Sequence, residues 1–276
     1  MMRIWSSGVD AERIRHMAAQ KEAAKPKFPS KEDGMQLWDP RGAATCTDKD
    51  IYTSLLPLKD AEILELGCGK ADVSRAIATD EPSTIITALE VDAAQHALNL
   101  ESPQLPNLQF ALGGAEKIPT PDEQFDIVLM FKSLHHVPAD LMGQALHEVR
   151  RVLKPGGLAY IAEPIFSGAF NEILRIFHDE EQARLAAFGA ITKAIAKGGM
   201  ELVAEKFFFT TTRLENFEAF ARRYIDVTHT THNLSKAQRA EVEKKFAQHM
   251  RPEGAVFKMP MRVDLLRKTG GARKNA

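Results

Sequence analysis

The sequence predicts a doubly wound α/β fold, in which helices flank a mostly parallel sheet. Three observations support this. Short apolar segments alternate with amphipathic segments between residues 61 and 165, as parallel strands joined by helices require. A glycine-rich turn at Gly67 and Gly69 follows the first apolar segment, where open α/β sheets bind ligands. The chain has 276 residues and is 44% hydrophobic, which is enough to bury the core of one enlarged domain.

The chain up to residue 165 is expected to contain an extension and then most strands of the core. Asp10 can cap a first helix, residues 25–42 read as a loop, and a second helix starts at Thr47. Core strands are expected over residues 62–66, 84–89, 108–111, 125–131 and 158–162. Core helices are expected over residues 72–78 and 93–100, and after residue 140, where Asp140 would be the cap.

The second half is expected to be more helical. Helices are predicted over residues 170–177 and 181–197, followed by a strand over residues 202–210. Gly198 and Gly199 are a helix stop. Two helices follow, one with an aromatic face and one with a capping box at Ser235 and Gln238. The last strand alternates from residue 257 to 265, and Pro260 inside it implies an edge, a bulge or a later start.

These segments divide the chain into four parts. Residues 1–60 are a helical extension or lid, and residues 61–210 with 256–268 are the core. Residues 211–255 are a helical cap insertion, and residues 269–276 are a disordered tail. The cap offers Phe217, Phe220 and Tyr224, which either line an acceptor pocket or simply pack the cap helices, the commoner role at this spacing.

Charge and composition narrow the classes of partner. The net charge is -1, so no nucleic-acid partner is expected. No apolar run approaches the length of about 18 residues that a membrane span needs, and residues 1–20 lack the apolar core of a signal peptide. Two cysteines do not make a disulfide framework, which indicates a cytoplasmic protein.

The chemistry is concentrated around the glycine turn. The segment ILELGCGKADVSRAIA, residues 63–78, runs from a buried strand through the turn into a helix; a tight connection without a ligand is the plainer reading. Glu90 lies about 20 residues further on, where a carboxylate can accept both hydroxyls of a ribose. Asp72 replaces the last glycine of the dinucleotide fingerprint and would repel a pyrophosphate. A nicotinamide oxidoreductase is therefore unfavoured.

Four blocks in order resemble one family. They are ELGCGKA (65–71), ALEVD (88–92), GGAEKIPTPDEQFDIV with SLHHVP (113–138), and RRVLKPGG (150–157). The sequence resembles the class I S-adenosylmethionine-dependent methyltransferases, especially the small-molecule branch typified by ubiquinone and menaquinone biosynthesis enzymes. The resemblance covers about 95 residues and is weak before residue 60 and after residue 165. It implies a Rossmann-like sheet with an antiparallel final strand.

The resemblance also implies a role for particular residues. The implied cofactor contacts are Glu65, Gly67, Cys68, Gly69, Glu90, Val91, Gly114, Ala115, Glu116, Met130 and His135. Among these, Glu65 and Gly67 would hold the methionine amino end, Glu90 the ribose and Val91 the adenine. The family often has Asp where this chain has Gly114, so Glu116 or a water is expected to supply that contact. Ala71 replaces the family's third glycine, a small change.

Methyl transfer is an in-line displacement that needs positioning, and it needs a base only if the nucleophile must lose a proton. The candidate catalytic residues are His135, His136 and Glu163, each with a packing or bracing role as the alternative. No metal is expected. His229 and His232 have metal-ligand spacing on a helix, but a substrate-contacting or structural role is preferred for them.

The expected function is transfer of a methyl group from S-adenosylmethionine, leaving S-adenosylhomocysteine, to a small organic acceptor. Oxygen, nitrogen, carbon and sulfur acceptors all remain open, and so does a homodimer. One alternative is a non-catalytic partner or regulatory subunit that binds S-adenosylmethionine. Another is a methyltransferase that acts on protein or RNA.

Overall fold

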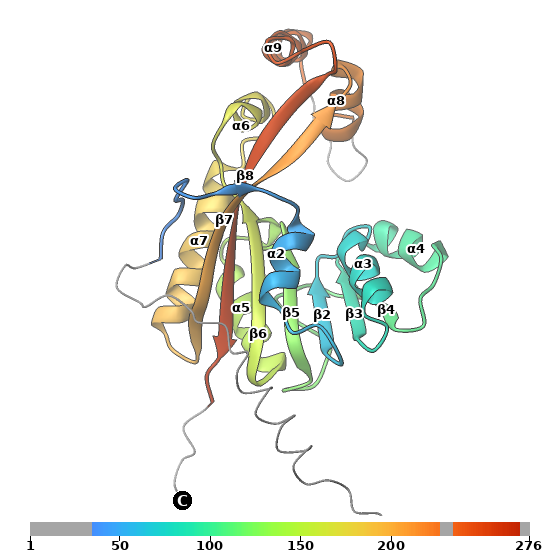
Figure 1. Ribbon diagram of the computed structural model, residues 1–276, viewed down its shortest axis with the longest axis vertical. Helices are drawn as coiled ribbons and strands as arrows, with labels where there is room; N and C mark the ends of the chain where they lie inside the picture. Colours follow the sequence, from blue (N-terminus) through green and yellow to red (C-terminus); the bar gives the residue numbers. More distant parts are fainter. Residues whose placement is uncertain (1–34, 227–233, 271–276) are drawn as a thin grey trace, which may run out of the picture. The chain divides into compact units, whose positions relative to one another are not determined.

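The computed structural model describes residues 35–226 and 234–270. Eight strands form one sheet in the order β1-β7-β8-β6-β5-β2-β3-β4 (Figure 1). The run from β6 to β4 is parallel throughout, whereas β8 is antiparallel to both β6 and β7. The predicted fold class, with its antiparallel final strand, is confirmed.

Most boundaries agree with the sequence to within a few residues. The strands are β1 Ala44–Thr45, β2 Glu62–Leu66, β3 Ile85–Glu90, β4 Leu108–Leu112, β5 Phe125–Phe131, β6 Leu153–Pro164, β7 Met200–Leu214 and β8 Ala255–Lys268. The helices are α2 Asp48–Leu55, α3 Asp72–Asp80, α4 Ala93–Glu101, α5 Met142–Val152, α6 Ala169–Leu174, α7 Glu181–Ala196, α8 Phe217–Tyr224, α9 Lys236–Ala247 and the 3-10 helix η1 Leu134–His136.

Helices cover both faces of the sheet. Because successive side chains of a strand point to opposite sides, neighbouring residues pack into different apolar clusters. In β2, Ile63 belongs to an apolar cluster shared with α2 and α3, whereas Leu64 belongs to a cluster shared with α5 and α7. In β5, Ile127 and Val128 divide between the same two clusters. The continuous apolar runs in the sequence follow from this two-sided burial.

The residues predicted to begin or end helices were confirmed at three places and wrong at one. Thr47 and Ser235 each form a capping box, and Gly198 and Gly199 end α7 with positive φ. Asp140 does not cap α5. The amide of Leu141 donates to the carbonyl of Pro138 in a turn, so the helix begins only after residue 141, with no side-chain cap.

The cap is carried on a two-stranded ribbon. Strand β7 continues to Leu214 instead of ending near residue 210, and with β8 it extends beyond the sheet to α8 and α9 (Figure 1). Strand β8 is internal, so Pro260 is not on an outer edge of the sheet. It lies one residue beyond the last pair of β6 and β8, Pro164 with Met261, and its carbonyl accepts from the amide of Ile165 at 2.9 Å.

Strand β1 was not predicted, because two residues carry no periodicity. Three predicted features lie outside the described residues: the first helix near Asp10, the tail after residue 270, and the pair His229 and His232. Among the described residues, no helix is both long enough and apolar enough to cross a membrane.

Candidate functional site

The turn after β2 needs glycine at its first position. Gly67 has φ +67°, and a Cβ there would lie 2.8 Å from the Cβ of Ser133, whose hydroxyl donates to the carbonyl of Leu66 at 2.8 Å. Gly69 has φ +54°, but a Cβ there would meet nothing within 4 Å. Gly67 therefore lets the turn pack against the segment after β5, whereas Gly69 borders open space.

Glu90, at the end of β3, connects the turn to the next loop. Its Oε2 accepts from the amide of Gly69 at 2.6 Å, and its Oε1 accepts from the amides of Val91 and Asp92 at 2.9 Å each. The side chain is buried, at 7% exposure. Since an ionised carboxylate has about four lone-pair sites, Glu90 keeps some capacity to accept from a ligand hydroxyl.

Glu65 lies beneath the turn and is fully enclosed. Its carboxyl accepts a hydrogen bond from the hydroxyl of Ser74 on α3. Burial raises the pKa of Glu65 to about 7, although the Ser74 hydrogen bonds act in the opposite direction. Burial also raises the pKa of the neighbouring Cys68 thiol to about 12. A cationic ligand group would therefore find a carboxyl whose charge state depends on pH near neutrality.

Glu65 should make the stability of the free protein depend on pH. Its folded pKa lies above the ordinary 4.5, so the folded state binds the proton more tightly between pH 4.5 and 7. The free energy of unfolding should fall as the pH rises through this window, by roughly 3 kcal/mol from this group. Urea denaturation of wild type and Glu65→Gln at several pH values isolates the effect. Equal pH slopes for the two proteins would contradict it.

An apolar rim lies beside Glu90. Val91 is 68% exposed and Leu112, at the end of β4, is 52% exposed, so both can pack on a flat ligand. The sequence indicated Val91 but missed Leu112, whose only signal is an apolar residue ending a strand. A Cβ at Gly114 would lie 2.5 Å from either carboxylate oxygen of Glu116. The Glu116 carboxylate thus occupies the space that a side chain at position 114 would fill.

The three candidate catalytic residues, His135, His136 and Glu163, lie close together at the ends of β5 and β6. The Nδ1 of His135 on η1 hydrogen-bonds Glu163 of β6, and the other oxygen of Glu163 accepts from the amide of Leu134 at 2.9 Å. The ring of His136 lies 4.1 Å from that of His135, centroid to centroid. His135 and Glu163 are buried, while His136 is exposed.

Glu180, which precedes α7, completes this cluster and was missed by the sequence reasoning. Its Oε1 lies 2.8 Å from the Nε2 of His178 and 3.8 Å from the Nε2 of His135, and its Oε2 accepts from Arg184 at 2.5 Å. Burial alone would raise its pKa, but the His178 hydrogen bond and the charge of Arg184 lower the pKa to about 2. His178 lies in the connection after α6, which ends at Leu174.

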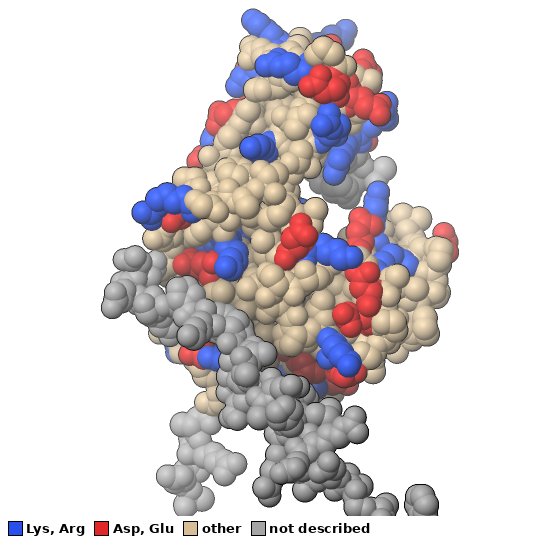
Figure 2. Space-filling model, viewed as in Figure 1, with Lys and Arg blue, Asp and Glu red and all other residues tan. Residues whose placement is uncertain are grey.

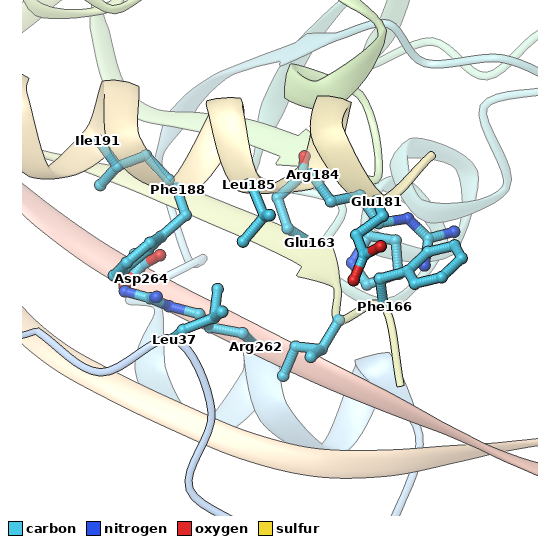
Figure 3. A pocket seen from close by; sticks show the side chains of 12 residues that line it. Leu37, Glu163, Phe166, Glu181, Arg184, Leu185, Phe188, Ile191, Arg262 and Asp264 are labelled. Atoms are coloured by element: carbon cyan, nitrogen blue, oxygen red, sulfur yellow. The ribbon is translucent and has the colours of Figure 1, made fainter. Parts of the chain in front are cut away.

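Next to this cluster, α7 and the strands β6 and β8 enclose a cavity with about 520 Å³ of free space, open mouth included (Figure 3). Its walls combine apolar and charged side chains: Leu37, Glu163, Pro164, Ile165, Phe166, Glu181, Arg184, Leu185, Phe188, Ile191, Arg262 and Asp264. Arg262 is buried, bonds Asp264 at 2.6 Å and lies over the Phe188 ring. Its Nη1 and the Nε of Arg184 have no hydrogen-bond partner within the described part of the chain.

Comparison with known proteins identifies the segment that holds the glycine turn. Residues 63–157 match a family model described as a methyltransferase domain. A demethylmenaquinone methyltransferase of Chlorobaculum parvum is 32% identical over 107 residues, which are 39% of this chain and 42% of the relative. A phthiotriol/phenolphthiotriol dimycocerosates methyltransferase of Mycobacterium leprae is 36% identical over 104 residues, 37% and 38% of the two chains. The chain thus spans about two fifths of the length of these curated relatives.

The fold likeness extends further than the sequence likeness. A solved S-adenosylmethionine-dependent methyltransferase from Methanosarcina mazei has a TM-score of 0.51 and 17% identity, covering 82% of this chain and 100% of that one. At that identity the likeness shows the fold alone.

The residues present fit S-adenosylmethionine, the cofactor of this family. The open space at Gly69, the carboxylate of Glu90 and the exposed Val91 suit an amino acid, a ribose and an adenine respectively. Asp72, in the first turn of α3, disfavours a phosphate-bearing cofactor at the same place. Residues 63–157 are therefore a methyltransferase domain by their match to the family model, and the turn at Gly67 and Gly69 suits S-adenosylmethionine.

Proposed function

We propose that this chain transfers a methyl group from S-adenosylmethionine to a small organic acceptor. One observation carries the proposal: a cavity with aromatic and apolar walls lies beside Glu163. It is on the same edge of the sheet as the glycine turn after β2 and Glu90 at the end of β3. In open α/β sheets that edge is where ligands bind. Glu65, Gly67, Cys68, Gly69, Glu90, Val91, Gly114, Ala115, Glu116, Met130 and His135 are the proposed cofactor contacts.

The cofactor supplies a methyl carbon activated by a positively charged sulfur. The residues around Glu65, Gly67 and Glu90 would hold the cofactor, which would supply the methyl group to the acceptor atom and keep the electron pair of its carbon–sulfur bond. The chain's own task is to hold the acceptor in line and to exclude water. His136 is the exposed histidine of the cluster and is the proposed proton acceptor for a hydroxyl. Glu163 and His135 bond each other and are proposed to orient this side of the pocket.

The cavity favours an acceptor with an apolar or aromatic body and at least one oxygen. Phe166 and Phe188 contribute aromatic surface to its walls, and the Nη1 of Arg262, which has no hydrogen-bond partner among the described residues, offers a buried donor. The relatives named above are described as a demethylmenaquinone methyltransferase and a phthiotriol/phenolphthiotriol dimycocerosates methyltransferase. A cytoplasmic location and a homodimer are also part of this proposal, the second to be tested by sedimentation.

Two other functions would use the same cofactor site. A non-catalytic binding partner would bind S-adenosylmethionine but turn over no acceptor. An RNA methyltransferase is less favoured, because basic and acidic side chains are interspersed on the face shown in Figure 2. A protein substrate is disfavoured only by the enclosed character of the cavity.

Calorimetric titration with S-adenosylmethionine, S-adenosylhomocysteine and NADH tests the proposal. We expect the two sulfur ligands to bind and NADH not to bind. Glu90→Ala should weaken their binding roughly 10- to 100-fold, because the two hydrogen bonds from the ribose hydroxyls to the Glu90 carboxylate are lost. Glu241→Ala, an exposed glutamate on α9, is the control. Binding of NADH, or unchanged binding by Glu90→Ala, would refute the cofactor assignment; binding without turnover of any acceptor would favour the non-catalytic partner.

A further inference from the structure

We propose that His135, His136 and Glu180 together bind a divalent transition-metal ion, Zn²⁺ by preference. The two histidines lie on η1 and the glutamate directly precedes α7, so two separate segments bring the donors together. One donor atom from each residue lies within 4.8 Å of the other two. The proposal goes beyond the proposed function, whose chemistry requires no metal.

The orientation of His135 is the first argument. Its Nδ1 is held by Glu163, so the ring presents Nε2 toward Glu180. A metal-binding histidine almost always donates its other ring N–H to a carboxylate or a carbonyl, which fixes the tautomer and aims the ligating nitrogen. Glu163 is itself fixed by the amide of Leu134. The His135–Glu163 pair therefore already has the arrangement of a metal ligand and its supporting carboxylate.

The spacing between His135 and Glu180 is the second argument. The distance of 3.8 Å from Nε2 to Oε1 is too long for a hydrogen bond, although both groups are largely buried. Two ligands of a tetrahedral Zn²⁺ are about 3.4 Å apart, given metal–ligand distances of roughly 2.0–2.2 Å. A shift of a few tenths of an ångström would close the pair on an ion.

The charge of the cluster and its access from solvent also favour a bound cation. The cluster contains two carboxylates, Glu163 and Glu180, against one guanidinium, Arg184, so with neutral imidazoles it carries a negative excess that a cation would neutralise. Arg184 occupies only Oε2 of Glu180 and leaves the Oε1 side to the histidines. His136 is exposed, which gives an ion a path from solvent.

The donor set also indicates the type of site. Two histidines and one glutamate are the ligands of catalytic zinc sites that keep an open fourth position. The Nε2 of His178, 2.8 Å from Oε1 of Glu180, stands at the border of the cluster and would hydrogen-bond the ligating carboxylate. With an ion bound, His136 would be a ligand, and an acceptor hydroxyl would lose its proton to solvent after coordination.

The test is Zn²⁺ binding to the full-length chain after removal of metal with a chelator. We expect one Zn²⁺ per chain by elemental analysis and calorimetry, and visible absorption typical of tetrahedral coordination when Co²⁺ replaces it. His136→Ala should remove stoichiometric binding, and Glu163→Gln should weaken it roughly 10- to 100-fold through His135. His136→Ala is the main variant because the side chain is exposed and the protein should stay folded.

Two controls distinguish this cluster from other histidines that could bind Zn²⁺. His147→Ala changes an exposed histidine on α5 and should leave Zn²⁺ binding unchanged. The double variant His229→Ala, His232→Ala tests the histidine pair whose spacing in the sequence also suits a metal. No stoichiometric Zn²⁺ in wild type, or loss in the double variant but not in His136→Ala, overturns the proposal. Titration with S-adenosylhomocysteine on the same samples shows whether they are folded and tests the cofactor assignment independently.

Discussion

Replacing Gly67 with alanine should destabilise the protein by roughly 2–5 kcal/mol and abolish binding of S-adenosylhomocysteine. The new Cβ would lie 2.8 Å from the Cβ of Ser133, on backbone that already has φ +67°. Positive φ costs a residue with a side chain about 1–2 kcal/mol, and overpacking costs about 1–3 kcal/mol more. Relief requires the turn to move away from Ser133, which also moves the Gly69 amide that bonds Glu90 in the proposed cofactor site. Urea denaturation and calorimetry measure the two effects separately.

Two other glycines provide matched controls. Gly42 has φ +74° with open space around its Cβ position and lies on the exposed surface, so Gly42→Ala reports the backbone strain alone. Gly69→Ala also meets no protein atom, but its methyl group would enter the space proposed for the cofactor. It should therefore weaken binding while costing no more stability than Gly42→Ala. Equal stability for Gly67→Ala and Gly42→Ala would contradict the packing argument.

Much of the sheet could be predicted from sequence because local and tertiary signals agree there. Strand β2 was predicted at its observed bounds, since a short, mostly apolar run flanked by turn residues is typical of a strand buried on both faces. The same holds for β5. Glu90 could be placed at the site because its spacing from the glycine turn reflects the length of one β–α–β unit. In these segments every level of the pattern favours one structure.

The features that were not predicted depend on tertiary contacts or turns that no local sequence pattern indicates. Glu180 precedes an ordinary helix, and only the packing of α7 against η1 brings it to His135. Strand β1 exists because it pairs with β7, more than 160 residues away along the chain. Asp140 had a suitable side chain for a cap, but the turn that starts at Pro138 sets where α5 begins. Sequence reasoning therefore predicted the carboxylate of Glu90 near the glycine turn but not the contact between Glu180 and His135.

Replacing Phe220 with alanine should unfold the cap while leaving the cofactor site intact. Phe220 is fully buried, and its ring lies 5.3 Å from that of Phe246 and 6.0 Å from that of Phe170, centroid to centroid. These aromatics belong to a third apolar cluster, separate from the two that cover the sheet. Truncation of a buried Phe costs about 3–5 kcal/mol, a large loss for a cluster of this size. Hydrogen exchange should speed up in α8 and α9 but not in β2 or β5.

The same variant tests whether the cap closes over the acceptor. The cap aromatics pack mainly on one another, so their role at helical spacing is first of all structural. If the packed cap also closes the pocket, Phe220→Ala should bind S-adenosylhomocysteine normally but lose methyl transfer. Phe125→Ala is the matched control, because it removes an equally buried ring from the sheet core and should impair cofactor binding as well. Full turnover by a Phe220→Ala protein with a rapidly exchanging cap would mean that the cap does not take part in the reaction, and acceptor binding would then have to rest on the cavity beside α7 alone.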